Sequence, residues 1–355
     1  MRAAVLWTGL SGYLNACLKE LAGREGVELF VSHQAAVEEA PFDDDQFAWI
    51  PNRLVWRSDV DVASLRDRLR AFDPEIMVFC GWHVHGYRQV AKEFAKRSFR
   101  VMAMDNCWNA TLKQRLGTLI APWYIQPIAD AAWVPGERQA VFARRLGFGQ
   151  CAILRGSLSC DRAAIETVHE SRLAAGRALP HSFLFLGRFV PDKGVDELVD
   201  AYQIYRESST APWPLVCCGA GPLGTRLQGQ PGIRVEGFVQ PGRLRDLLAV
   251  SGCLVLPSNL EPWGLVIHEA TSAGLIILAS EKAGAAVHLV QDNYNGFIFD
   301  SGDVKGLAAL MSHVSNLSEA RLDAMSRASY LLSRQFSPAR WADTILEGFQ
   351  TFSRR

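Results

Sequence analysis

The sequence lacks an excess of charge of either sign. Its 37 lysines and arginines balance 37 aspartates and glutamates, and the sequence pI is about 7.1. A neutral chain gives no overall electrostatic reason to bind nucleic acid. The sequence also lacks any run of about 18 apolar residues, the length that a membrane-spanning helix requires. We therefore expect neither a nucleic-acid-binding protein nor an integral membrane protein.

Cysteine patterns typical of disulfides or zinc sites are also absent. The eight cysteines are scattered among apolar residues, with no C-x-x-C pair and no cluster with histidine at zinc spacing. Residues 1–10 hold one arginine and an apolar run too short for the hydrophobic region of a signal peptide. These absences predict reduced core cysteines and a cytoplasmic protein. The inner face of the membrane is a second location, which rests on the basic segments described at the end of this section.

Short apolar runs alternate with amphipathic segments along the whole chain, which is typical of parallel α/β folds. The length of 355 residues and the 49% hydrophobic content suit two globular domains. Two series of strands are predicted, at 3–7, 27–32, 76–80, 100–104 and 131–134, and at 183–186, 214–218, 233–236, 253–256 and 275–279. Predicted helices lie near 13–23, 62–72, 84–97, 137–146, 194–207, 241–249, 264–273 and 303–314.

A polar stretch at 169–180 separates the two series. We predict two doubly wound, Rossmann-like α/β domains, 1–170 and 171–335, followed by an amphipathic helix within 336–355. Ligands of such domains bind at the carboxyl ends of the strands, here facing a cleft.

One apolar run followed by a turn predicts an anion-binding helix start near Gly264. The first amides of a helix have no intrahelical partner and lie at the positive end of its dipole, so those of Gly264, Leu265 and Val266 suit a phosphate. Glu261 precedes this helix and Glu269 lies inside it. Two carboxylates in these places suit two hydroxyl-rich ends of one ligand, with phosphates between them.

A second informative segment follows the predicted strand 183–186. Arg188 and Lys193 leave its carboxyl end together. Two cations in this place could hold a pyrophosphate without a metal ion.

Together, these segments resemble the retaining nucleotide-sugar glycosyltransferases of the GT-B fold, often called family four, whose signature is E-x7-E. The motifs are Gly187-Arg188 to Lys193-Gly194, Gly219-Ala220-Gly221-Pro222, Gly237-Phe238-Val239, and Glu261 to Glu269. The resemblance is dense over 183–303 and looser over the first 170 residues. It implies a GT-B fold with an acceptor-side first domain, a donor-side second domain, and a last helix that crosses back to the first.

The resemblance implies a nucleoside-diphosphate sugar as donor, with no metal and no other cofactor. Arg188 and Lys193 would hold the diphosphate and stabilise the leaving phosphate, while Glu269 would accept hydrogen bonds from the ribose and Glu261 would orient the sugar. The donor-binding residues are then Gly12, Gly187, Arg188, Lys193, Gly237, Phe238, Val239, Glu261, Pro262, Trp263, Gly264, Leu265, Val266 and Glu269. The acceptor hydroxyl would attack from the face that the phosphate leaves, and a phosphate oxygen would take its proton.

The first domain departs from the family pattern. Family members commonly place a histidine near the sugar, just after a strand, where this chain has Asp105. We count Asp105 with Arg188, Lys193 and Glu261 as the catalytic set. The expected acceptor side chains are His83, Trp82 and Trp108, and the acceptor is a carbohydrate, a lipid-linked compound or a small molecule.

Three alternative interpretations compete with this one. Asp43 to Asp45 and Asp59 to Asp61 contain D-x-D, the metal motif of the other glycosyltransferase fold, although Asp61 is a good cap for the helix after it. Gly219 to Gly224 satisfies the dinucleotide pattern G-x-G-x-x-G, with a proline inside it. In a rival function, the chain is a partner subunit that binds a nucleotide sugar in the same cleft but no longer transfers the sugar.

A peripheral membrane contact is the last prediction. A helix over 84–97 would align Arg88, Lys92 and Lys96 in one stripe, and the segment 112–128 mixes basic with aromatic and aliphatic residues, as expected near lipid headgroups. The competing interpretation is a solvated helix face and a buried loop.

Overall fold

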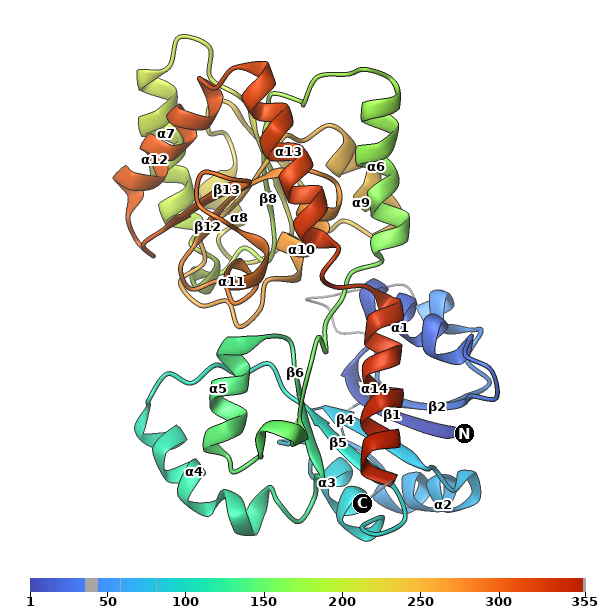
Figure 1. Cartoon of the computed structure of the whole chain (residues 1–355). Helices are drawn as coiled ribbons and strands as arrows, with labels where there is room; N and C mark the ends of the chain where they lie inside the picture. Colours follow the sequence, from blue (N-terminus) through green and yellow to red (C-terminus); the bar gives the residue numbers. More distant parts are fainter. Residues whose placement is uncertain (36–43, 58, 81, 354–355) are drawn as a thin grey trace. The chain divides into compact units, whose positions relative to one another are not determined.

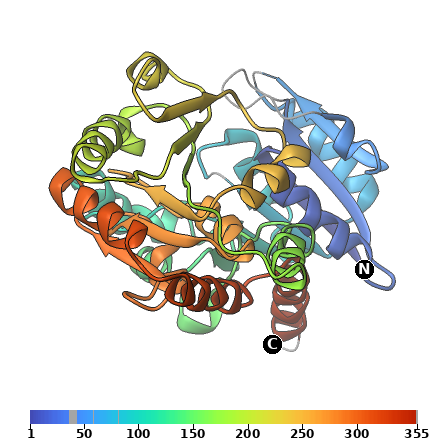
Figure 2. The same ribbon diagram turned by 90° about the horizontal axis from the view of Figure 1, so that it is seen from above.

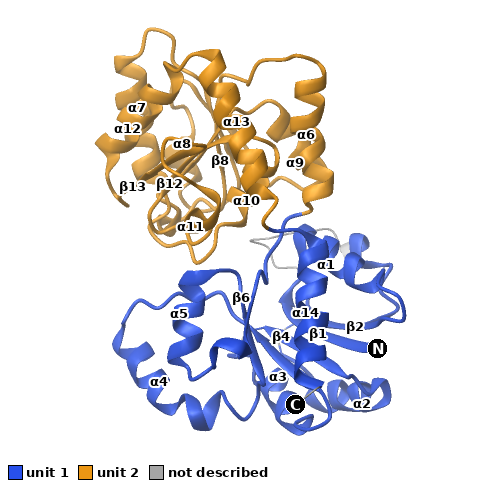
Figure 3. Ribbon diagram, in the orientation of Figure 1, with its two compact units in different colours: residues 1–160, 336–355 blue, residues 161–335 orange. Residues whose placement is uncertain are grey.

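The computed structural model describes all of the chain except residues 36–43, 58, 81 and 354–355. It forms two compact units (Figure 3): unit 1 holds residues 1–160 and 336–355, and unit 2 holds residues 161–335. The second unit begins just before α6 (Arg162–Ala174), whereas we predicted a boundary at 170, inside this helix. The whole of α6 belongs to unit 2 because it packs on the helices α9 (Pro241–Ala249) and α10 (Leu265–Ser272).

Unit 1 is built on a seven-stranded parallel sheet in the order β3-β2-β1-β4-β5-β6-β7 (Figure 1). Its strands are β1 (Arg2–Gly9), β2 (Glu28–Gln34), β3 (Asn52–Trp56), β4 (Ile76–Cys80), β5 (Phe99–Ala103), β6 (Ala131–Val134) and β7 (Ile153–Arg155). Its helices are α1 (Gly12–Ala22), α2 (Val62–Phe72), α3 (His85–Glu93), α4 (Leu112–Tyr124), α5 (Glu137–Arg145) and α14 (Pro338–Ser353), with 3-10 turns η1 (Asp44–Phe47) and η2 (Gln150–Ala152). Apolar cores lie on both faces of the sheet.

Unit 2 has a six-stranded parallel sheet in the order β10-β9-β8-β11-β12-β13. Its strands are β8 (Phe183–Leu186), β9 (Leu215–Cys218), β10 (Ile233–Glu236), β11 (Cys253–Leu256), β12 (Ile276–Ser280) and β13 (Gly296–Phe299). Its further helices are η3 (Pro191–Lys193), α7 (Val195–Ser208), α8 (Gly224–Leu227), α11 (Ala286–Leu289), α12 (Val304–Ser315) and α13 (Glu319–Ser333). Helices α7 and α12 cover one face, and α6, α9, α10 and α13 gather on the other (Figures 1 and 2).

The predicted strands are confirmed wherever the sheet buries both faces. Strands β4 and β11, for example, are buried at every residue, and a strand covered on both sides reads as a continuous apolar run. The strands β3, β7 and β13 were not predicted. Each lies at a sheet edge and is short or partly exposed, so its sequence carries a weaker apolar signal.

The helix predicted over 84–97 is shorter in the structure. Helix α3 ends at Glu93, and Lys96 adopts a left-handed backbone with φ of 70° as the chain turns into β5. Lys96 therefore does not continue a helical stripe with Arg88 and Lys92, and that part of the membrane prediction is wrong. No helix in the described part of the chain is long and apolar enough to cross a membrane.

Helix α14 completes unit 1 although it is 175 residues or more distant in sequence from the rest of that unit. Its Trp341 is buried, its ring centroid lies 4.6 Å from that of Trp133 on β6, and its indole nitrogen donates to the Ser157 carbonyl oxygen at 2.9 Å. The helix also packs along α1. The chain end is thus fastened to unit 1 by a buried aromatic pair.

Substitution Trp341→Ala should lower the free energy of unfolding by about 3–5 kcal/mol, because it leaves a cavity in a packed core and removes a buried hydrogen bond. Urea unfolding followed by tryptophan fluorescence measures the loss. The matched control is Trp123→Ala, since Trp123 is 78% exposed and its loss should change stability by less than about 0.5 kcal/mol. Equal effects of the two substitutions would contradict the role of Trp341.

Candidate functional site

Each sheet reverses its strand order at one place, and the predicted site residues gather there. In unit 2 the order reverses between β8 and β11, and in unit 1 between β1 and β4. In open α/β sheets, ligands bind outside the carboxyl ends of the strands at such a point. In unit 2, the segments that follow β8 and β11 carry Arg188, Lys193, Glu261 and Glu269.

Backbone hydrogen bonds join the loop after β8 to the loop after β11. The carbonyl oxygen of Asp192 accepts the amides of Asn259 and Leu260 at 2.8 and 3.0 Å. Gly194 has φ of 68°, and a Cβ there would lie 2.1 Å from the carbonyl oxygen of Pro257. Only glycine permits this approach, so the two loops hold one fixed arrangement.

Helix α10 begins where the sequence predicted an anion-binding helix start. Gly264 caps it with φ of 87° and without a side-chain hydrogen bond, and a Cβ on this residue would lie 3.0 Å from Cγ of Glu261. The glycine thus lets the loop fold back over Glu261. The amides of Leu265 and Val266, in the first turn of α10, carry the partial positive charge of the helix dipole.

Glu269 is a carboxylate without a partner among the described residues. It lies on α10 and is half-buried, and its side chain has no hydrogen bond or ion pair in that part of the chain. Burial raises its pKa to about 7. A carboxylate held away from water without a partner costs stability, and such groups occur typically where a ligand supplies the missing hydrogen bonds.

The two predicted cations differ in their surroundings. Lys193 forms an ion pair with Glu261, and both side chains are largely buried. The Ser258 hydroxyl also lies 3.5 Å from Glu261. Arg188 is exposed after β8, and no ion partner for it is found among the described residues. We had assigned Lys193 to phosphate and Glu261 to sugar, and the structure shows that these two groups bind each other.

The G-x-G pattern after β9 serves close packing. Gly219 and Gly221 have φ of 147° and 149°, and a Cβ at these positions would lie 1.9 Å from the Gly187 carbonyl oxygen and 2.5 Å from that of Phe189. The amide of Gly219 also donates to the carbonyl oxygen of Gly237 at 3.2 Å. These contacts account for the glycines without a dinucleotide, and β9 is not the strand at the reversal point.

The remaining predicted donor-binding residues lie in the segments before α9 and α10. Phe238 and Val239 are half-buried between β10 and α9, and Pro262 is half-buried ahead of α10. Trp263 is buried, with its ring centroid 5.8 Å from that of His288, and its carbonyl oxygen accepts the Ala285 amide at 2.7 Å. The Trp263 side chain therefore belongs to the core, and only its backbone is available to a ligand.

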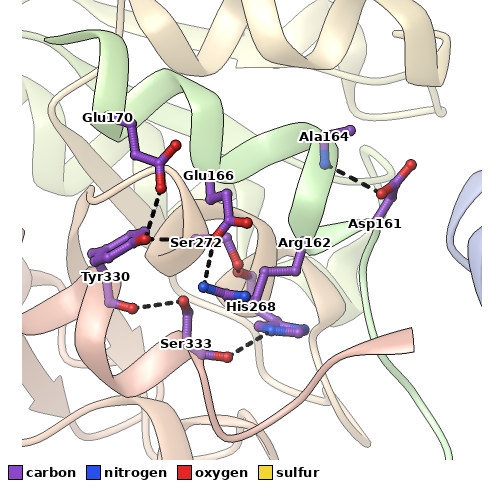
Figure 4. Close-up of polar contacts among 9 residues, drawn as sticks. All are labelled: Asp161, Arg162, Ala164, Glu166, Glu170, His268, Ser272, Tyr330 and Ser333. Carbon is purple, nitrogen blue, oxygen red and sulfur yellow. Dashed lines mark hydrogen bonds and ion pairs between the residues drawn. The ribbon is translucent and has the colours of Figure 1, made fainter. Parts of the chain in front are cut away.

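His268, one position before Glu269, is a core residue. It is fully buried, and its Nε2 lies 3.1 Å from the carbonyl oxygen of Ser333 on α13 (Figure 4). The Tyr330 hydroxyl joins α13 to α6 by donating to Glu170 at 3.0 Å. The His268 contact joins α10, the helix that carries Glu269, to α13, and the Tyr330 contact joins α13 to α6.

Unit 1 contains a cavity of about 470 Å³ at the carboxyl ends of β1, β4 and β5. Three of the predicted residues, Trp82, His83 and Asp105, line it together. Trp108 is absent from the lining: its ring packs on Phe142 and lies under the guanidinium of Arg145. The sequence analysis missed other lining residues, which are Trp7, Thr8, Tyr13, Cys80, Met102, Ala103, Met104, Asn106, Ser157 and Leu158.

Tyr13 is the missed residue that a sequence signal could have found. It directly follows the segment Gly9 to Gly12, which in the resemblance corresponds to the family's glycine loop after the first strand. Gly9 lines the cavity, whereas Gly12 starts helix α1 and is not part of the lining. Loss of solvation in this concave site raises the pKa of the Asp105 carboxyl group, an effect that a backbone hydrogen bond and nearby His83 partly offset.

The metal motifs find no support in the described residues. Asp61 caps α2 by accepting the amides of Ala63 and Ser64 at 3.0 and 3.2 Å. Asp43, the first residue of the other motif, lies outside the described residues. Elsewhere in the described chain, no three His, Cys, Asp or Glu side chains are grouped to hold a metal ion.

Two parallel α/β units of this kind define the GT-B glycosyltransferase fold. HepE of Anabaena, solved in complex with UDP, has this fold: it superposes with a TM-score of 0.75 at 17% identity, over 99% of this chain and 100% of HepE. Residues 179–330 match the family described as glycosyl transferases group 1. This match lies within unit 2. The predicted resemblance to glycosyltransferases and the predicted GT-B fold are thereby confirmed, whereas retention of configuration and the E-x7-E signature stay predictions.

Similar proteins of known sequence match only part of this chain. The D-inositol 3-phosphate glycosyltransferase of Mycolicibacterium smegmatis is 29% identical over 178 residues, 46% of this chain and 39% of that protein. The glycosyltransferase YqgM of Bacillus subtilis is 28% identical over 134 residues, 36% of this chain and 37% of that protein. The matched part thus spans less than two fifths of the length of either relative.

The half-buried carboxylate of Glu269 predicts a stability that depends on pH. Its pKa of about 7, raised from 4.5, means that the folded state favours the neutral form. The free energy of unfolding should then fall by about 1–2 kcal/mol as the pH rises from about 5 to 8. Urea unfolding of Glu269→Gln, which stays neutral, should lack this loss, and the variant should be more stable than wild type at pH 8.

The matched control is Glu207→Gln, at an exposed position on α7, which should keep the wild-type profile. If Glu269→Gln also follows the wild-type profile at every pH, the carboxyl group of Glu269 does not have a raised pKa in the folded protein.

Proposed function

We propose that the protein is a retaining glycosyltransferase that moves a sugar from a nucleoside-diphosphate sugar to an acceptor hydroxyl. The observation that carries the proposal is the unpartnered, half-buried Glu269, on the helix whose free amides lie at the carboxyl end of β11. A ribose offers two neighbouring hydroxyls to such a carboxylate. The group 1 family match over this unit supports the same activity, and it disfavours the rival of a subunit without transfer activity.

In this proposal the donor diphosphate binds between the helix start and the two cations. The amides of Leu265 and Val266 and the guanidinium of Arg188 bind phosphate oxygens. Lys193 is shared, because its ion pair with Glu261 leaves donor hydrogens of the ammonium group for phosphate. Glu261, already oriented by Lys193, accepts hydrogen bonds from the transferred sugar.

The neighbouring loops complete the donor site in the proposal. Gly187 lets phosphate approach the end of β8, and the segment Gly237 to Val239 lies along the base. Catalysis then rests on positioning and on stabilising the charge that develops on the leaving phosphate. The acceptor hydroxyl attacks from the side of the leaving group, whose oxygen takes the proton, so the anomeric configuration is retained.

A uridine diphosphate sugar is the first donor to test. HepE of Anabaena has been solved with UDP-glucose, and although its low identity supports only a shared fold, it names a concrete ligand. The proposed enzyme needs no metal, since cations and helix amides neutralise the diphosphate. A cytoplasmic location and contact with the inner face of a membrane remain parts of the proposal.

We further propose that the unit 1 cavity takes a neutral hydroxyl compound as acceptor. Its described lining holds the carboxylate of Asp105 and the imidazole of His83 but no lysine or arginine. The indole of Trp82 offers a face for a sugar ring. The name of the Mycolicibacterium relative includes inositol 3-phosphate. A phosphorylated acceptor of that kind would require a lysine or an arginine, which the described lining does not contain.

Transfer should survive EDTA and should depend on Arg188. The substitution Arg188→Ala should slow transfer by about 100-fold, as for the loss of one group that stabilises transition-state charge. Product NMR measures both the rate and the anomeric configuration. Arg206→Ala, at an exposed arginine on α7, is the control and should keep the wild-type rate. Activity that disappears with EDTA and returns with manganese, or inversion at the anomeric carbon, would overturn the proposal.

Acceptor pairs that differ only by one phosphate group test the neutral cavity. Sugars and cyclitols should be better acceptors than their phosphate esters by about tenfold or more, because Asp105 repels an added phosphate and no cation binds it. Initial rates with a fixed donor give the ratio for each pair that yields product. A consistent preference for phosphate esters would contradict the assignment.

A further inference from the structure

Helix α4 presents apolar side chains to the outside of unit 1. Leu112, Leu119 and Trp123 are 80%, 69% and 78% exposed, and Leu116 and Ile120 are also more than half exposed. These residues recur at helical spacing and so form one continuous stripe, which we name the α4 stripe. An exposed stripe of this size on one helix is unusual for a protein surface that meets only water.

The stripe lies on the face of α4 that points away from the core. At about 100° per residue, its five side chains cluster around one direction. Ala121 and Ile125, which are buried in unit 1, project to the opposite side. The usual pattern, with apolar residues inward and polar residues outward, is therefore inverted over most of this helix.

Cations flank the stripe on both sides. By the same helical geometry, Lys113 and Arg115 project about 80° to either side of its centre. The sequence from residue 106 to residue 129 contains no aspartate or glutamate. On the neighbouring helix α3, Arg88 lies over the ring of Tyr124 at 3.6 Å. The whole face is thus apolar at its centre and basic at its margins.

We infer that α4 is a membrane-surface helix that lies flat on anionic lipid, with the α4 stripe in the acyl region and Lys113 and Arg115 at the headgroup phosphates. Long basic side chains reach phosphates in this way from the sides of an apolar face. The helix has 13 residues, which is too short to span a bilayer. The inference goes beyond the proposed glycosyl transfer and does not depend on it.

Charge favours lipid over a second copy of the chain. If two α4 stripes packed on one another, the flanking lysines and arginines of both copies would meet, and the segment around them offers no carboxylate to pair with. An anionic membrane supplies the complementary charge along both margins of the stripe. The mixture of leucine, isoleucine and tryptophan is also typical of helices in the interfacial layer.

Co-sedimentation with vesicles tests the inference. Wild-type protein should bind phosphatidylcholine vesicles in which about one lipid in three is the anionic phosphatidylglycerol, and binding should weaken as salt rises. The triple variant Leu116→Ser, Leu119→Ser, Trp123→Ser should lose at least about tenfold in partitioning. The double variant Lys113→Gln, Arg115→Gln should lose mainly the part of vesicle binding that depends on salt.

The matched control changes exposed apolar residues of unit 2, Ile204→Ser and Val250→Ser, and should bind like wild type. Circular dichroism checks folding, which the variants should keep because the altered side chains are exposed. Light scattering reports the oligomeric state.

Absence of vesicle binding at low salt, or a dimer that the triple variant disperses without any lipid binding, would overturn the inference. Binding of UDP by all variants, measured separately, keeps this test distinct from that of glycosyl transfer.

Discussion

The proposed donor site of unit 2 depends on the contact between the backbones of two loops. The loop after β8 and the loop after β11 meet where the Asp192 carbonyl oxygen accepts two amides and where Gly194 lies against Pro257. Any side chain at residue 194 would push the loops apart. Because Lys193 sits beside this glycine and Glu261 follows the Pro257 turn, the same contact brings the lysine and the glutamate into their ion pair.

The remaining polar groups of unit 2 are arranged around that contact at a cost in stability. Glu269 lacks a partner and carries a raised pKa, so the folded protein is less stable at neutral pH than it would be with a neutral residue there. His268 beside it is fully satisfied inside the core. Neighbouring residues on one helix thus divide into a structural histidine and a carboxylate without a partner among the described residues, which we propose binds the ligand.

Much of this arrangement was predictable because buried parallel strands leave long apolar runs, and because glycines and charges follow those runs at recognisable spacing. The strands β8 and β11 and the helix after Gly264 were found in this way. Edge strands such as β3 were missed, since their half-exposed residues carry little signal. The pairing of Lys193 with Glu261, 68 residues apart in sequence, could not be predicted, because spacing does not tell which of two possible partners a cation contacts.

Periodicity also could not tell which way α4 faces. The same spacing of leucines fits a buried or an exposed stripe, and only the position of Ala121 and Ile125 in the core decides between them. The left-handed turn at Lys96 was similarly invisible, because a lysine gives no sign of a positive φ. Trp108 was expected beside the acceptor, but its packing on Phe142 fills a space that the sequence does not reveal.

The central claim is that Glu269 stays unpartnered in order to receive a nucleotide ribose, and calorimetry of UDP-glucose binding tests it most directly. The intact protein should bind with an affinity that rises about tenfold from pH 6 to pH 8, as a carboxyl group with a pKa of about 7 ionises. The variant Glu269→Gln should bind more weakly, with an affinity that hardly changes over this range. Equal affinity and an equal pH profile for the two proteins would contradict the account.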